Sequence, residues 1–96
     1  MSDFELVDQG EGQFVLSGDM SFQTADRILK ASASAFDQYT TLRVDMSGVA
    51  KADSAGLALL LEWKAQAARR DAEIFYDAVP DSLAAIAITS EVSDLL

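Results

Sequence analysis

The sequence predicts an α/β domain: a small mixed β-sheet of about four strands with helices packed on one side. Short strand-like runs alternate with segments whose apolar residues recur at helical spacing, in the order β-β-α-β-α-β-α. A hairpin near the start supplies an antiparallel pair, while helical segments of ten or more residues between the later strands imply parallel crossovers. We therefore expect residues 1–96 to form a single domain.

The first two strands are predicted on either side of a glycine-rich turn. The first strand carries apolar residues at Phe4, Leu6 and Val7. The turn is the Gly-Glu-Gly sequence at residues 10–12, and residues 13–17 (QFVLS) form the returning strand. Gly18 and Asp19 are expected to end that strand.

A helix is predicted next, followed by a short strand. Ser21 or Thr24 suits the N-cap position, and the helix is expected to reach about Asp37. Its apolar residues lie at helical spacing: Ala25, Ile28, Leu29, Ala33 and Phe36. Residues 42–46 (LRVDM) predict the strand, and the Ser-Gly pair at residues 47–48 predicts a turn after it.

The second half of the chain predicts a long helix, a strand and a last helix. The long helix covers about residues 54–70 and ends in two arginines, where the helix dipole favours cations. Residues 73–77 (EIFYD) predict a strand, and Pro80 suits the first position of the last helix. The apolar side of that helix is formed by Leu83, Ala84, Ile86, Ala87 and Ile88. Residues 92–96 are expected to form a final turn.

Composition excludes several classes of function. The formal net charge of −9 disfavours binding to nucleic acid or anionic lipid but suits a basic protein partner. The chain has no cysteine and no histidine, so it lacks thiol chemistry, the usual zinc ligands and the commonest general base. No signal peptide is evident, and the longest apolar run, residues 57–61, is far shorter than the ~20 residues that span a bilayer. We expect a cytoplasmic protein without a cofactor and without direct membrane insertion.

Ser54 stands where the strand-like run gives way to the long helix, and it suggests several roles. Asp53 or Ser54 suits a helix N-cap, which is a purely structural role. A nucleophilic Ser54 would need a base, but only Lys51 and Asp53 are near in sequence, and no known serine-hydrolase motif surrounds it. Aspartates such as Asp45 and Asp53 are more often solvated or capping residues than metal ligands, so we predict neither catalysis nor a metal site.

The long helix has an unusually wide apolar arc. One stripe contains Leu60, Trp63 and Ala67. A second contains Ser54, Ala58, Leu61 and Ala65, with Leu57 between the two. Either the domain buries both stripes, or one stripe meets a partner with Ser54 at its tip; the sequence leaves open which stripe is the core. Ala55 and Gly56 leave the helix start accessible to another molecule, although Gly56 equally suits tight packing under the preceding strand.

The central segment LRVDMSGVAKADSAGLALLLEW resembles the centre of STAS domains, the fold of bacterial anti-sigma-factor antagonists. In that family an apolar strand ends in an aspartate and a small residue, and a D-[ST]-[small]-G-L motif begins an apolar helix. The matching positions here are Asp45, Ser47, Val49, Asp53, Ser54, Gly56 and Leu57. The segment FVLSGDMSFQTADRIL is similar to the family's second strand and first helix, so the resemblance covers nearly the whole chain and implies a STAS-like fold.

The resemblance implies one of two roles. In the sigma-factor switch, the serine that matches Ser54 is phosphorylated by an anti-sigma kinase, which blocks binding to that kinase. In the MlaB-like branch, a small STAS protein binds the cytoplasmic ATPase of an ABC system that moves phospholipid across the Gram-negative envelope, and the matching hydroxyl residue contacts the ATPase. The run GLALLLEW resembles the second branch, and Lys51 departs from the aliphatic turn of sigma antagonists. The MlaB-like reading is therefore favoured.

We accordingly expect a partner-binding surface at the start of the long helix. Its residues are Ser54, Ala55, Gly56, Leu57, Ala58 and Leu61, with Asp45 and Asp53 as motif residues. The partner implied is an ABC transporter ATPase, and through it a permease, which would place the chain at the inner membrane without insertion; the alternative partner is an anti-sigma kinase. A phosphate on Ser54 would add about −1.5 to −2 charge and weaken docking.

Overall fold

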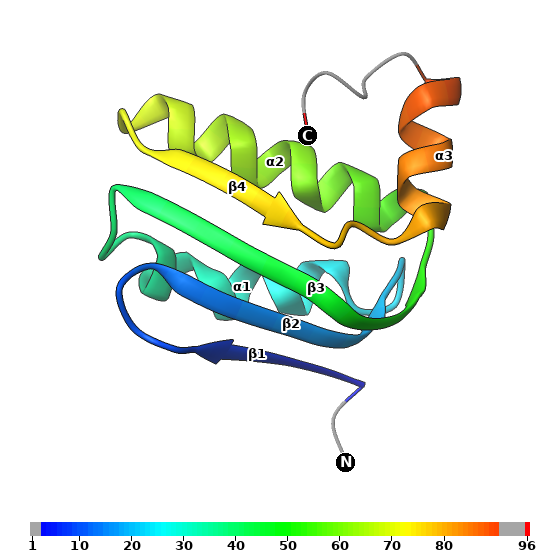
Figure 1. The fold of residues 1–96 in the computed structure, drawn as a ribbon, viewed down its shortest axis with the longest axis horizontal. Helices are drawn as coiled ribbons and strands as arrows, with labels where there is room; N and C mark the ends of the chain where they lie inside the picture. Colours follow the sequence, from blue (N-terminus) through cyan, green and yellow to red (C-terminus); the bar gives the residue numbers. More distant parts are fainter. Residues whose placement is uncertain (1–2, 91–95) are drawn as a thin grey trace.

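The computed structural model describes residues 3–90 and residue 96, which form a four-stranded sheet backed by helices (Figure 1). The elements in chain order are β1 (Phe4–Asp8), β2 (Gln13–Met20), α1 (Ala25–Phe36), β3 (Thr41–Ala52), α2 (Ser54–Arg69), β4 (Glu73–Asp77) and α3 (Asp81–Thr89). This order confirms the predicted α/β fold with a small mixed sheet. None of the helices in the described residues is both long enough and apolar enough to cross a membrane.

The strands lie in the order β1-β2-β3-β4. β1 pairs antiparallel with β2, whereas β2, β3 and β4 are parallel neighbours. Both parallel connections step in the same direction along the sheet, and such crossovers are almost always right-handed, so their helices lie on the same side. Figure 1 shows α1 and α2 on one face of the sheet and α3 beside one end of α2. The expectation of helices packed on one side is confirmed.

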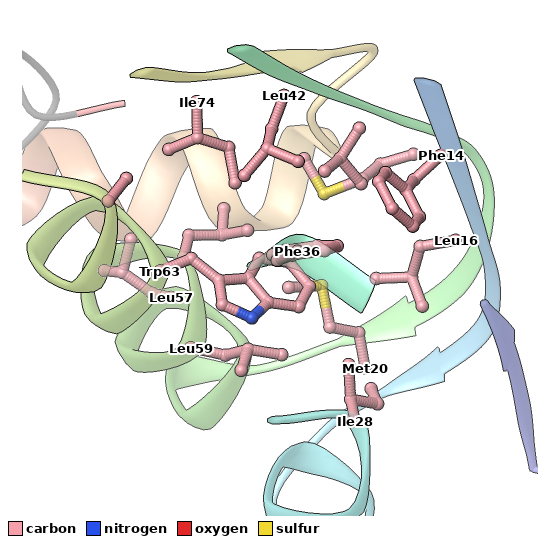
Figure 2. Close-up of a cluster of buried hydrophobic side chains, with 14 of the residues drawn as sticks. Phe14, Leu16, Met20, Ile28, Phe36, Leu42, Leu57, Leu59, Trp63 and Ile74 are labelled. Atoms are coloured by element: carbon pink, nitrogen blue, oxygen red, sulfur yellow. The ribbon is translucent and has the colours of Figure 1, made fainter. Parts of the chain in front are cut away.

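The core lies between this face of the sheet and helices α1 and α2 (Figure 2). Alternate residues of β2, β3 and β4 are buried there: Phe14, Leu16, Leu42, Val44, Met46 and Ile74. Trp63 of α2 is only 1% exposed and lies 5.0 Å from Phe36 of α1 between ring centroids. Its indole Nε1 donates a hydrogen bond of 2.9 Å to Ser32 Oγ, which satisfies a buried polar group. Trp63 therefore joins the two helices through both an aromatic contact and a hydrogen bond.

β2 and β3 are longer than predicted. The expected ends at residues 18–19 and 47–48 are wrong, because the strands continue to Met20 and Ala52. The pairing changes register from Val15↔Asp45 to Ser17↔Gly48, so an extra residue of β3 is accommodated there. Gly18 and Gly48 therefore lie at bulges within the paired strands, and not in turns between elements.

The helix ends differ from the prediction in detail. Thr24 occupies the N-cap position of α1, but its hydroxyl forms no cap bond; it accepts the Ser21 N–H at 2.9 Å instead. α3 begins at Asp81, one residue later than expected, with Pro80 as its cap residue. The predicted final turn over residues 92–96 lies outside the described residues, apart from Leu96.

The opposite face and the β4 edge of the sheet carry polar and aromatic side chains. Arg43 forms an ion pair of 2.7 Å with Asp77, and its guanidinium carbon lies 5.2 Å from the ring centroid of Phe75. At the edge of β4, Lys64 of α2 donates a 2.8 Å hydrogen bond to the Ile74 carbonyl. This lysine occupies a backbone acceptor of an edge strand, which is one way in which proteins protect such edges.

Candidate partner-binding site at the start of helix α2

Asp53 organises the start of α2. Its backbone is extended, and its Oδ1 accepts the Ala55 N–H at 2.9 Å, so Asp53 is the N-cap of the helix. Its Oδ2 accepts the Phe22 N–H at 3.1 Å, which ties the loop after β2 to the same point. Of the two candidate caps in the sequence, the structure therefore selects Asp53.

The hydrogen bonds to Asp53 and Asp45 keep both carboxylates charged. The Phe22 N–H is the main cause that lowers the pKa of Asp53, and the amides of Ala55 and Gly56 add to it. Asp45 accepts the Ser47 N–H at 2.8 Å, and this bond lowers its pKa as well. Both motif aspartates thus bind backbone amides. Within the described parts of the chain, no group of three or more acidic side chains is arranged to hold a metal ion.

Ser54 is the first residue of α2, and it is exposed. Its hydroxyl is not needed as a cap, because Asp53 fills that role. Backbone amides bind both oxygens of Asp53 and lower its pKa, so this neighbouring carboxylate is only a weak base for Ser54. The exposed hydroxyl at a helix N-terminus is suited to contact with another molecule or to modification.

The structure identifies the core stripe of α2. Leu60 and Trp63 are 0% and 1% exposed, and Ala67 is also buried. Ala58 is exposed, and Leu61 is half-buried. The stripe that begins at Ser54 therefore faces outward, whereas the stripe of Leu60 packs on the sheet.

Two of the six predicted surface residues lie inside the molecule. A Cβ added to Gly56 would stand 2.7 Å from the Met20 carbonyl oxygen, so this glycine permits close packing of α2 against the end of β2. Leu57 is 5% exposed and belongs to the core. These two residues position the helix start, while Ser54, Ala55, Ala58 and Leu61 retain exposed surface.

A groove beside Ser54 was not predicted. It has a volume of about 540 Å³ and lies between α1 and α2. Its lining residues are Phe22, Ala25, Asp26, Leu29, Ala55, Ala58, Leu59 and Glu62, which we call the Phe22 groove. Phe22 is 85% exposed. Sequence reasoning missed it because a single phenylalanine between a strand and a helix belongs to no periodic pattern.

Comparison with known proteins gives a match to a family and to solved structures. Residues 7–96 match the sequence model of the family described as "Mlab, STAS domain". Among proteins with curated descriptions, none matches the sequence.

The solved structures share the fold at low sequence identity. The anti-sigma-factor antagonist SpoIIAA in its unphosphorylated form has a TM-score of 0.69 and 16% identity, over 96% of this chain and 84% of that chain. The phosphorylated form of the Bacillus cell fate determinant SpoIIAA has a TM-score of 0.71 and 16% identity, over 96% and 86%. A structure described as Mglu aligns over 80% of this chain and 19% of its own, at a TM-score of 0.60 and 18% identity.

Proposed function

The chain belongs to the Mlab, STAS domain family, and from that premise we propose that it is a non-catalytic subunit that binds and regulates the ATPase of an ABC-type phospholipid transport system. STAS domains are protein-interaction modules, and the family description supports the Mla system, which maintains lipid asymmetry of the outer membrane. The ATPase would connect the subunit to a permease and hold it at the cytoplasmic side of the inner membrane.

The observation that carries this proposal is the exposed start of α2. Ser54 and Ala58 face outward on a helix whose position is fixed by the Asp53 cap and by the close packing of Gly56. Small side chains let a partner approach the helix backbone, and the Ser54 hydroxyl offers both a donor and an acceptor. The net charge of −9 favours a partner surface that carries lysine or arginine.

The test is an affinity purification of the tagged protein from its native cell, with the bound proteins identified by mass spectrometry. We expect an ABC ATPase and its permease to be recovered with the wild-type protein and to be lost with Ser54→Asp. Ser34→Asp, which adds the same charge at an exposed position of α1, is the matched control and should retain both proteins. Recovery of an anti-sigma kinase without an ATPase would overturn the proposal.

A second candidate is an anti-sigma-factor antagonist that is switched by phosphorylation of Ser54. The exposed hydroxyl, which does not serve as a cap, favours it. A phosphate at a helix N-terminus is compatible with the helix dipole, so it would alter the contact surface without unfolding the domain. Phosphate on Ser54 of the native protein, together with a kinase in the purified complex, would establish this function in place of the first.

A further inference from the structure

Three hydrogen bonds tie down the loop that carries Phe22, although the aromatic ring of Phe22 is exposed. The Phe22 N–H donates to Asp53, the Ser21 N–H donates to Thr24 Oγ1, and the Thr24 hydroxyl donates to the Asp19 carbonyl at 2.9 Å. The ring is nevertheless 85% exposed. Because the backbone at Phe22 is already ordered, binding would cost only the rotamer freedom of the ring, which suits a preorganised anchor.

The Phe22 groove next to this ring has an apolar floor. Leu29 of α1 and Leu59 of α2 contribute to the floor, and Ala55 and Ala58 leave space above α2. Ala55 and Ala58 also belong to the proposed contact surface around Ser54. The groove and the start of α2 therefore form one continuous surface.

The rim of the Phe22 groove is acidic. Asp26 stands on α1 and Glu62 stands on α2. Asp26 pairs with Lys30 at 2.8 Å, and Glu62 pairs with Arg69 at 3.2 Å, but the side chains in both pairs are 45% exposed or more. Exposed pairs of this kind contribute little, so each carboxylate can accept a cation from a partner instead. A net charge of −9 reinforces that preference.

We propose that the Phe22 groove binds an amphipathic helix of the ATPase partner. Phe22 contacts the apolar stripe of that helix, while Asp26 and Glu62 accept its flanking lysine or arginine side chains. A groove between two helices that is lined by Leu29, Leu59 and small alanines suits this mode of recognition. The inference rests on the proposed function and extends the contact surface from Ser54 across to α1.

The anchor is tested by the affinity of the purified protein for the purified ATPase subunit. Phe22→Ala should weaken binding about 30-fold or more, as expected for a hot-spot aromatic residue, and Phe22→Leu should restore part of it. Phe75→Ala, at a phenylalanine on the opposite face of the sheet, is the control and should change affinity by less than about twofold. Equal losses for the two alanine variants would overturn the anchor role. Thermal unfolding should be unchanged by Phe22→Ala, because the ring is exposed.

The rim is tested by a pair of charge reversals. Glu62→Lys and Glu73→Lys change the net charge equally, but only Glu62 lines the Phe22 groove. Glu62→Lys should weaken binding about tenfold or more and should reduce the dependence of affinity on salt between about 50 and 500 mM NaCl. If both variants lose affinity equally, long-range charge is responsible and the assignment of Glu62 to the interface is wrong.

Photo-crosslinking in the native cell separates this inference from the proposed function. The residue p-benzoylphenylalanine is placed at position 22, or at position 54, in otherwise wild-type protein. We expect both positions to crosslink to the ATPase, with position 22 reaching a helical segment flanked by lysine or arginine. Crosslinks from position 54 alone would overturn the groove and leave the proposed function standing. If position 22 crosslinks to a lipid or to a second copy of the chain, the groove does not bind a helix of the ATPase. If neither position crosslinks to an ATPase, the proposed function fails as well.

Discussion

The two apolar stripes of α2 differ in the size of their side chains. The face toward the sheet carries Leu60 and Trp63, which are almost completely buried. The outward face carries Ser54 and Ala58, which are exposed, and the half-buried Leu61. Hydropathy alone describes both stripes as mostly apolar. Their difference shows that large residues secure the helix to the domain, whereas small residues leave its other side open to close approach.

This division predicts that stability and partner binding respond to different residues of the same helix. Substitutions on the buried face should destabilise the domain, and substitutions on the outward face should leave its stability nearly unchanged and affect binding. The expected change in the free energy of unfolding is therefore largest at the buried Leu60 and smallest at the exposed Ser54.

Leu60→Ala should cause the largest loss in the free energy of unfolding. Leu60 is 0% exposed, and truncation of a buried leucine costs about 2–5 kcal/mol. The control is Leu61→Ala, at the next residue, which is half-buried and should cost much less. Urea unfolding followed by circular dichroism measures both. Equal losses would mean that the two faces of α2 contribute alike to stability.

Gly56→Ala should destabilise the protein although alanine is the better helix former. The added Cβ would stand 2.7 Å from the Met20 carbonyl oxygen and 3.3 Å from its side chain, so α2 must shift away from β2. Overpacking of this kind costs about 1–3 kcal/mol, which exceeds the roughly 1 kcal/mol that alanine contributes to helix propensity. Thermal unfolding at neutral pH measures the change, and a raised melting temperature would contradict the packing described here.

Asp53→Ala should cost about 1–2 kcal/mol, because it removes a helix cap together with the acceptor for the Phe22 N–H. Asp53→Asn, which keeps one amide oxygen as an acceptor, should cost less. Urea unfolding of the wild type and of both variants at pH 7 ranks their free energies of unfolding. An Asn variant as unstable as the Ala variant would show that the charge, and not the acceptor geometry, stabilises this site.

The contribution of Asp53 should also depend on pH. Hydrogen bonds lower its pKa in the folded protein below the ordinary value of 3.8, so the folded state favours the carboxylate. Its contribution to stability is therefore full above pH 3.8 and is lost as the pH falls through the lowered pKa. The difference in melting temperature between wild type and Asp53→Asn should be constant near neutral pH and should shrink in acid. If the difference in melting temperature grew in acid, the pKa of Asp53 would be raised by folding and not lowered.

Ser54→Asp should have the smallest effect on stability and a large effect on binding. An exposed substitution changes the free energy of unfolding by less than about 0.5 kcal/mol, and an acidic residue in the first turn suits the helix dipole. The same charge lies within the proposed contact surface, so affinity for the ATPase should fall, whereas Ser54→Ala should be milder. Calorimetric binding and thermal unfolding of both variants separate these effects. A stable variant with unchanged affinity would remove Ser54 from the interface.

The order and type of the elements could be predicted from the sequence because their patterns are local. The helical spacing of Ile28 and Phe36 and the alternation in residues 42–46 depend only on neighbours along the chain. The lengths of β2 and β3 depend instead on their pairing. Gly18 and Gly48 are typical of turns by themselves, and only the opposite strand shows that they belong to a bulged ladder.

The candidate site could be predicted only in part, for a similar reason. The motif around Asp53 and Ser54 indicated where the surface begins, but burial of Gly56 and Leu57 depends on how closely α2 approaches β2. Phe22 lies 31 residues before Asp53 in the sequence, and the hydrogen bond that joins them is a tertiary contact. No local sequence pattern predicts a contact between two residues so far apart in the chain.

The position of Trp63 has a consequence for spectroscopy. It is the only tryptophan of the chain, it is almost fully buried, and its indole N–H is bonded to Ser32. Selective excitation of this ring therefore yields an intrinsic fluorescence signal from the junction of α1 and α2, with emission at short wavelength while the domain is folded and a red shift on unfolding. The outward face of α2 contains no tryptophan. A tryptophan introduced at position 22 or 58 would add a second, solvent-exposed chromophore that reports on the partner.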